Sequence, residues 1–311
     1  MLKRFNRMAC TLAALSIGVG TASTALAEEN FQLNTISILA SNNASLNATT
    51  GEGSTNKKLN EFQFEHFGLN KWGYLYFDLE SYNGHGVGAL PAYNNSTNGF
   101  GSYPGYTPST ANSSVASGHA FDLYGVVIPS VSLTKVTGKS FTFGPISDIS
   151  LIARASADSY YHYRSFGVGP SFNFAVPGFD WFESGVITHN SSIDYSMYYG
   201  VNNGGNTTFD KNKWLWRTLI MSKPIEVAGE RFNFNFLSIV NTTGGGNNGE
   251  HGRSAFARTE LLWQIGGNTD YQLGVRLESS YHTYDPTLTT NTYGYNTYKK
   301  NVPFLMFKYT L

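Results

Sequence analysis

The sequence predicts a single all-β domain, a transmembrane antiparallel β-barrel of about 12 strands, and three observations lead to this fold class. Beyond its first residues the chain has no apolar run near the roughly 18 residues that a transmembrane helix needs. Short segments instead alternate apolar and polar side chains, as strands do because successive residues point to opposite faces. Short turns also alternate with long polar connections, which is typical of barrels that span the bacterial outer membrane.

The first 27 residues have the features of a secretory signal peptide. Three basic residues within the first seven positions precede a mostly apolar stretch, and Ala25-Leu26-Ala27 is a small-x-small cleavage site. We therefore expect a signal peptide over residues 1–27 and the barrel over residues 28–311. The one cysteine, Cys10, would leave with the peptide, so no disulfide is expected in the exported chain.

Charge and composition exclude several other classes of protein. Removal of the peptide takes three of the 21 basic residues and none of the 21 acidic ones, which leaves a net charge of about −3. No basic tail or stripe is present, so a nucleic-acid partner is not expected. The seven histidines show no HExxH motif or paired spacing, and we predict neither a metal nor a cofactor.

Twelve segments alternate well enough to be predicted as strands, and the last one shows the pattern clearly. Leu305 and Phe307 alternate with Met306 and Lys308, and the chain then ends on an apolar residue that lipid can cover. In chain order, the strands and their predicted lipid-facing residues are 31–40 (Ile36, Ile38), 58–67 (Phe62, Phe64), 72–82 (Leu75, Phe77, Leu79), 119–134 (Phe121, Leu123, Val127), 146–158 (Ile149, Leu151, Ala153), 163–176 (Val168, Phe172, Phe174), 181–199, 212–223 (Trp214, Trp216, Ile220), 231–241 (Phe232, Phe234, Phe236), 254–265 (Leu261, Trp263), 271–284 (Leu273, Val275, Leu277) and 301–311 (Leu305, Phe307, Tyr309, Leu311).

The connections divide into two kinds that alternate along the chain. Gly68–Lys71, the link through Gly138 and Gly144, and Pro177–Asp180 are short and are predicted to lie in the periplasm. The stretch 83–118 is too rich in Gly, Asn, Ser and Pro to form a core, and it is predicted as one long extracellular loop. The Asn/Gly-rich stretch 200–211 is predicted as another loop.

All five tryptophans fall near predicted strand ends, as expected for aromatic girdles at the two membrane interfaces. Trp72, Trp181 and Trp263 lie beside short turns, and Trp214 and Trp216 lie beside a long loop. A soluble barrel with an apolar interior is the alternative that shows the same alternation. The signal peptide, the girdles and the two kinds of connection favour the membrane barrel.

Several short stretches give the chain a resemblance to a known family. They are Phe64-Glu65-His66 with Trp72-Gly73, Leu123-Tyr124-Gly125 with Pro129–Leu133, Thr137–Lys139 with Phe143–Asp148, and Gly169-Pro170 with Val176–Phe179. In this order the chain resembles the Tsx-like nucleoside-specific channel-forming proteins of the bacterial outer membrane. The resemblance implies a twelve-stranded barrel with a narrow pore that binds nucleosides. Two features depart from the family pattern: the terminal Leu311, where such barrels usually end in Phe, and the length of the loop 83–118.

The predicted inward face carries charges of both signs together with tyrosines. A mixed lining suits a neutral solute rich in hydroxyls and amides, whereas a ring of one sign would select ions. Tyrosine rings can stack on nucleobases, and charged groups can bond ribose hydroxyls. The alternative is that these charges pair with one another and fill the lumen. The residues predicted to line the substrate path are Glu65, Tyr74, Tyr76, Asp78, Asp122, Tyr124, Arg154, Arg217, Arg258, Glu260, Arg276 and Glu278.

The predicted function is therefore a channel in the outer membrane of a Gram-negative bacterium for passive diffusion of nucleosides or similar small neutral solutes, and not an enzyme. Its expected partners are these solutes, outer-membrane lipids, and a phage or another ligand at the extracellular loops. One alternative is a receptor or adhesin barrel that acts through its long loop. A second is an enzyme, since His189 and Ser191 resemble the His-x-Ser of outer-membrane phospholipase A.

Overall fold

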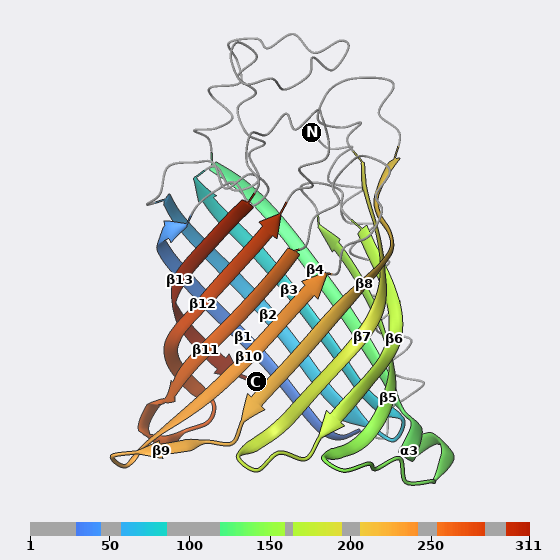
Figure 1. Ribbon diagram of the computed structural model, residues 1–311. Coiled ribbons are helices and arrows are strands. Elements are labelled where there is room, and N and C mark those ends of the chain that lie inside the picture. The colour runs from blue at the N-terminus through green and yellow to red at the C-terminus, as the bar shows by residue number, and fades with distance from the viewer. Residues whose placement is uncertain are drawn as a thin grey trace.

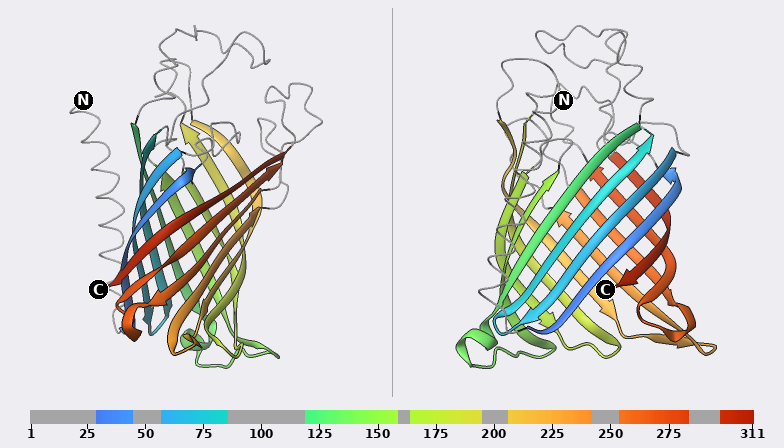
Figure 2. Two further views of the ribbon diagram at one scale, coloured as in Figure 1. Left: turned by 90° about the vertical axis from the view of Figure 1, so that its left-hand side faces the viewer. Right: turned by 180° about the vertical axis from the view of Figure 1, so that it is seen from behind.

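The protein forms one closed β-barrel in a computed structural model that describes residues 29–44, 57–85, 119–158, 164–194, 206–241, 254–283 and 297–311. Twelve antiparallel strands build the barrel, and their tilt is visible from three sides (Figure 1 and Figure 2). Consecutive strands pair around the ring, and pairing of the first strand with the last closes it. The predicted twelve-stranded antiparallel barrel is confirmed. The predicted signal peptide lies outside the described residues.

The strand bounds follow the predicted segments with shifts at their ends. The strands are β1 (Glu29–Ala44), β2 (Lys57–Asn70), β3 (Gly73–His85), β4 (His119–Ser132), β5 (Ile146–Asp158), β6 (Arg164–Phe174), β7 (Phe179–Asp194), β8 (Asn206–Ser222), β9 (Ile225–Val227), β10 (Glu230–Asn241), β11 (Ser254–Gln264), β12 (Tyr271–Thr283) and β13 (Thr297–Thr310). The short β9 pairs only with β10 and adds to its edge, so it is not one of the twelve.

Several predicted boundaries are shifted, and β2 and β3 extend into the predicted turn Gly68–Lys71 and the predicted loop 83–118. β8 begins at Asn206, so part of the predicted loop 200–211 is strand, paired with the end of β7. The predicted strand 119–134 ends at Ser132, because Ser132 caps a short helix, α3 (Leu133–Thr137), by accepting a hydrogen bond from the backbone N–H of Lys135. Gly138 ends this helix with φ of 68°, a left-handed conformation that glycine adopts without strain.

The polarity of the barrel is inverted relative to a soluble protein. On β13, Leu305 is 61% exposed on the outer face, whereas its inward neighbours Phe304 and Met306 are buried. Charged side chains are buried inside, and Arg276 on β12 has no exposed surface at all. An apolar outer face around a polar, charge-bearing interior is the arrangement that lipid requires. The soluble-barrel alternative, which would place the charges outside, is therefore excluded.

The described connections all lie at one end of the barrel, which we call the short-turn end. They are the turn 71–72, the segment 133–145 with α3, the turns 175–178 and 223–229, and the segment 265–270 with the 3-10 helix η1 (Ile265–Gly267) (Figure 1). Most of the predicted long loop 83–118 lies outside the described residues. Neither helical segment in the described part of the chain is long and apolar enough to cross a membrane.

The tryptophans do not form the two predicted girdles. Trp181 points into the barrel, where its ring contacts Phe67 and Tyr74. Trp214 and Trp216 lie well inside β8, because that strand begins earlier than predicted. Only Trp72 and Trp263 remain beside short turns with the expected placement.

Apolar side chains also occupy part of the interior. One cluster lies on β1, β2, β11 and β13, and a second extends from β2 and β3 across β4 and β5 to β7 and β8. The second cluster contains Ile128, Ile152 and Ile187, which point inward with at most 3% of their surface exposed. The inward face is thus less polar than predicted, and large parts of the lumen are packed by side chains, as expected for a barrel of intermediate size.

Candidate functional site

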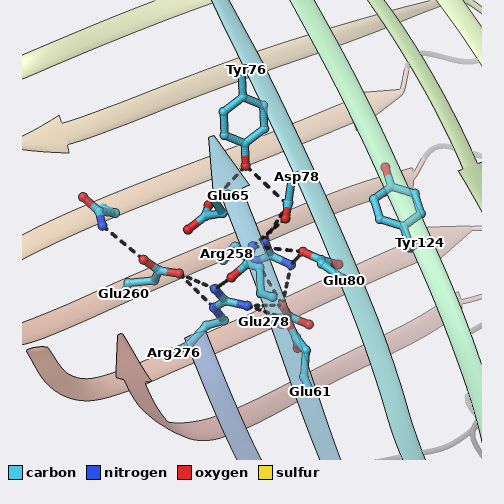
Figure 3. Close-up of polar contacts among 12 residues, drawn as sticks. Glu61, Glu65, Tyr76, Asp78, Glu80, Tyr124, Arg258, Glu260, Arg276 and Glu278 are labelled. Atoms are coloured by element: carbon cyan, nitrogen blue, oxygen red, sulfur yellow. Dashed lines mark hydrogen bonds and ion pairs between the residues drawn. The ribbon is translucent and has the colours of Figure 1, made fainter. Parts of the chain in front are cut away.

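Nine charged side chains form a connected network inside the barrel, which we call the ion-pair belt. They come from the inward faces of β2, β3, β11, β12 and β13. The members of the belt are Glu61, Glu65, Asp78, Glu80, Arg258, Glu260, Arg276, Glu278 and Lys308. Six carboxylates therefore share three cationic groups, and Figure 3 shows the part of the belt around Arg258 and Arg276.

Arg258 is the centre of one half of the belt. Its guanidinium group contacts Glu80, lies 2.9 Å from Oε1 of Glu278, and lies 3.6 Å from Oδ2 of Asp78. Arg258 is on β11 and Glu80 is on β3, five strands apart around the ring. This ion pair therefore spans the interior and does not run along the wall between neighbouring strands.

Arg276 and Lys308 complete the belt. Nη1 of Arg276 lies 2.7 Å from Oε1 of Glu61, and Nη2 lies 2.7 Å from Oε1 of Glu260. Nζ of Lys308 lies 2.8 Å from Oε2 of Glu65. Because these groups have lost almost all contact with water, each charge depends on its partners for stabilisation. The belt therefore narrows the lumen at its level and holds opposite sides of the barrel together.

A cavity of about 650 Å³ lies inside the barrel between the belt and the short-turn end, and we call it the lumen cavity. Its rim includes Phe31, Asp180, Pro224 and Thr269, which lie at or next to strand ends at the short-turn end. Its deep end includes belt members and Tyr76, whose hydroxyl donates to Glu65 at 3.2 Å.

The lining of the lumen cavity mixes apolar and polar side chains. Phe67 on β2, Trp181 on β7 and Met221 on β8 are apolar or aromatic. Asn233 and Asn235 come from β10, where Asn235 is paired directly with Met221, and charged belt members complete the lining. A cavity lined by aromatic side chains and a few placed polar groups is the usual form of a small-molecule site.

The structure brings seven of the predicted path residues to the belt or the lumen cavity. Glu65, Tyr76, Arg258 and Glu260 line the cavity, and Asp78, Arg276 and Glu278 lie in the belt behind it. Tyr74 contacts the cavity residues Phe67 and Trp181 but is buried within the second apolar cluster. Because Tyr74 is only 2% exposed and packs against these two rings, its ring face is not free to stack on a solute, and its hydroxyl donates to Glu183 at 2.9 Å.

The remaining predicted path residues lie elsewhere. Arg217 pairs with the buried Glu183 on the neighbouring strand β7. Arg154 donates to the hydroxyls of Tyr124 and Ser165 at 2.7 and 2.8 Å, and Tyr124 stands apart from the belt (Figure 3). The backbone of Asp122 belongs to β4, but its side chain is outside the described part of the structure.

Sequence reasoning missed several residues that line the cavity. Asn233 and Asn235 were placed on the inward face of their strand but were not assigned to the site. Gln264 was not singled out, although it follows the same alternation as Arg258 and Glu260. The sequence predicts a girdle position for Trp181, whereas the structure places its side chain in the lining of the lumen cavity. The only signal for this inward face is the spacing of two between Trp181 and Glu183, because Val186 and Ile187 further along β7 show no contrast between the faces.

The enzyme alternative does not fit the geometry of its two residues. His189 and Ser191 are 3% and 4% exposed and point into the barrel. A lipid outside the barrel cannot reach a nucleophile on this inner face. In addition, the described residues contain no group of three or more His, Cys, Asp or Glu side chains arranged to hold a metal ion.

The chain matches no protein-family model and no curated protein. Among solved structures it is similar to Pseudomonas aeruginosa OccK5 (OpdH), with 11% identity, coverage of 90% of this chain and 97% of that chain, and a TM-score of 0.27. It is also similar to a BenF-like porin from Pseudomonas fluorescens Pf-5, with 10% identity, coverage of 92% and 99%, and a TM-score of 0.23. A third similar structure is Salmonella typhi OmpF in complex with daunomycin, with 9% identity, coverage of 90% of this chain and 97% of that chain, and a TM-score of 0.22. Similarity at this level says nothing of what this barrel binds, and the resemblance to Tsx-like channels stays a prediction.

Proposed function

We propose that the protein is a bacterial outer-membrane channel for selective, passive diffusion of small neutral solutes, with nucleosides as the favoured class. The observation that carries this proposal is the lumen cavity, an amphipathic space inside a lipid-facing barrel whose deep charges are already paired. The cavity supplies a binding place on the path, and the belt supplies a narrow section beyond it. Charged side chains at a narrow section are a common means of selection in channels.

The pairing of the charges disfavours an anionic solute. All three cations of the belt, Arg258, Arg276 and Lys308, already contact its six carboxylates. The other charged group that lines the cavity, Asp180, is also acidic; it lies at the exposed rim and has no ion pair among the described residues. An anion that entered the deep end would lose water without gaining a free cation, which costs free energy.

The size and aromatic content of the cavity favour a nucleoside among neutral solutes. Small-molecule sites typically have volumes of about 300–1,000 Å³, and this cavity lies within that range. Phe67 and Trp181 offer ring surfaces, and stacking of a base on an aromatic side chain contributes about 1–3 kcal/mol. The polar groups of the lining suit ribose hydroxyls and base edges.

Current through single channels in planar bilayers tests this proposal. We expect the mature barrel to conduct small ions and adenosine to block the current reversibly, because the nucleoside occupies the lumen cavity. Adenosine monophosphate, which adds two ionisable oxygens to the same base and sugar, should block at least ten-fold more weakly. Absence of any conductance would refute the channel, and equal block by the nucleoside and the nucleotide would refute the neutral class.

A further inference from the structure

Three neighbouring amide side chains line the lumen cavity, and we call them the amide row: Asn233, Asn235 and Gln264. Nε2 of Gln264 donates to Oδ1 of Asn233 at 3.0 Å. Nδ2 of Asn235 donates to Oε2 of Glu260 at 3.1 Å, which joins the amide row to the ion-pair belt. These bonds fix the positions of the three amides on β10 and β11.

Each amide keeps one polar atom without a partner in the described part of the structure. Gln264 is only 1% exposed, and its Oε1 is a buried acceptor with no hydrogen bond. Asn233 uses only its oxygen, so its NH₂ group remains a donor, and Asn235 uses only its NH₂ group, so its oxygen remains an acceptor. An unmet buried acceptor is costly, and in native proteins such an atom commonly has a functional partner.

Trp181, which is separated from Asn235 by only Met221 on the strand between them, adds a flat apolar surface and one further free donor to the cavity. The Trp181 ring lies edge-on to Phe67 with ring centroids 5.2 Å apart, and edge-on to Tyr74 at 5.4 Å. These contacts hold the indole in a fixed orientation. Nε1 of Trp181 is buried and has no hydrogen-bond partner among the described residues.

From this arrangement we propose that the amide row is the element that discriminates between solutes, and that it binds the edge of a planar ring carrying a donor beside an acceptor. The inference rests on the proposed channel function and names the part of the solute that is recognised. Amide side chains bond base edges because their donor and acceptor lie side by side in one plane. The aromatic side chains of the cavity would cover the face of the same ring.

The tyrosines are less suited to this role than the sequence predicted. The hydroxyl of Tyr76 is occupied by Glu65 and Asp78 (Figure 3). The hydroxyl of Tyr74 is occupied by Glu183. Neither group is left to distinguish one base from another. The amide row, in contrast, is held in place by its own bonds, and its three side chains line the lumen cavity and keep polar atoms without a partner in the described part of the structure.

A comparison of two nucleosides that differ in a single group tests the role of Gln264. Adenosine carries an exocyclic amine, and purine riboside has a hydrogen in its place. We expect adenosine to block wild-type channels at about three- to ten-fold lower concentration, because the amine can donate to Oε1 of Gln264. In Gln264→Leu this difference should disappear, since leucine has a similar size but cannot accept a hydrogen bond.

Gln32→Leu is the matched control, because Gln32 lies on β1 near the short-turn end but is exposed and does not line the lumen cavity. This variant should retain the wild-type difference between the two nucleosides. Equal block by both nucleosides in wild-type channels would overturn the inference. A difference between the nucleosides that persists in Gln264→Leu would also overturn it. Either result would leave the channel proposal standing. If neither nucleoside blocks a conducting wild-type channel, the nucleoside class itself is wrong and the inference fails with it. The wild-type comparison needs no substitution, so it decides the matter even if Gln264→Leu does not fold.

Discussion

At the scale of single residues, the protein places charges where a soluble protein would place a core. Arg276 illustrates the consequence, because it contacts three carboxylates and has no exposed surface. A buried pair of this kind contributes little net stability compared with apolar packing of equal volume. Loss of only one partner is costly, however, because the remaining charges stay buried without compensation.

We therefore predict that Arg276→Met lowers the free energy of unfolding by about 3–5 kcal/mol, because Glu61 and Glu260 would lose their shared cation. Urea-induced unfolding of the barrel in lipid vesicles measures the change. Arg231→Met is the control, since Arg231 pairs with Glu226 at an exposed position and such pairs contribute almost nothing. Equal effects of the two substitutions would contradict the structural importance of the belt.

At the scale of elements, β6 and β7 pair in an unusual way. Their backbone pairing is in register at both ends but is interrupted over residues 167–170 and 186–189. The hydroxyl of Thr188 bonds the backbone N–H and carbonyl of Val168, both at 3.1 Å, in place of the regular ladder. The carbonyl oxygens of β7 lie over Gly167 and Gly169, where a Cβ atom would be only 1.8 and 2.1 Å away.

We predict that Gly169→Ala destabilises the barrel by about 1–3 kcal/mol, because the added methyl group would collide with the backbone oxygen of Val186. Gly125→Ala is the matched control. Gly125 is also a strand glycine, but a Cβ there would first meet a side-chain atom of Leu79 at an ordinary 3.7 Å. Thermal unfolding measured by circular dichroism should separate the two variants, and similar midpoints would show that the close approach does not matter.

The elements also show what the sequence can predict and what it cannot. Alternation identified both faces of β13 because Leu305 faces lipid whereas Lys308 faces a polar neighbour, so the two environments select different residues. It failed for β7, where Val186 and Ile187 are apolar on both faces and leave no contrast to read. The position of a residue along the barrel axis is not encoded in the alternation either, so Gln264 could be assigned a face but not a place beside Asn233.

At the scale of the whole molecule, the belt is formed by residues far apart in sequence. Glu80 and Arg258 are 178 residues apart and meet only because the ring closes and its strands are tilted. No local pattern predicts which inward charges come to the same level across a lumen. The sequence therefore predicted the barrel and the inward charges, but it could not predict that the charges would join into one belt beside a cavity.

The crossing of the lumen by Arg258 and Glu80 leads to a prediction about conduction. Replacing both with glutamine removes this ion pair, and glutamine at position 258 is shorter than arginine, so it cannot reach across the interior as Arg258 does. Glu278 keeps its contact with Arg276, whereas Asp78 loses its contact with Arg258. We expect the double variant Arg258→Gln with Glu80→Gln to conduct at least twice the single-channel current of the wild type. Its discrimination between nucleosides and larger neutral solutes should fall, because the narrow section has widened.

The control for this experiment is the double variant Arg217→Gln with Glu183→Gln. This pair is equally buried and has the same chemistry, but it joins the neighbouring strands β7 and β8 along the barrel wall. Its replacement should leave the single-channel current close to that of the wild type, since it opens no passage across the lumen. An equal rise in current in both double variants would mean that loss of any buried pair loosens the barrel. An unchanged current in the Arg258 and Glu80 variant would mean that the solute path does not pass through the belt.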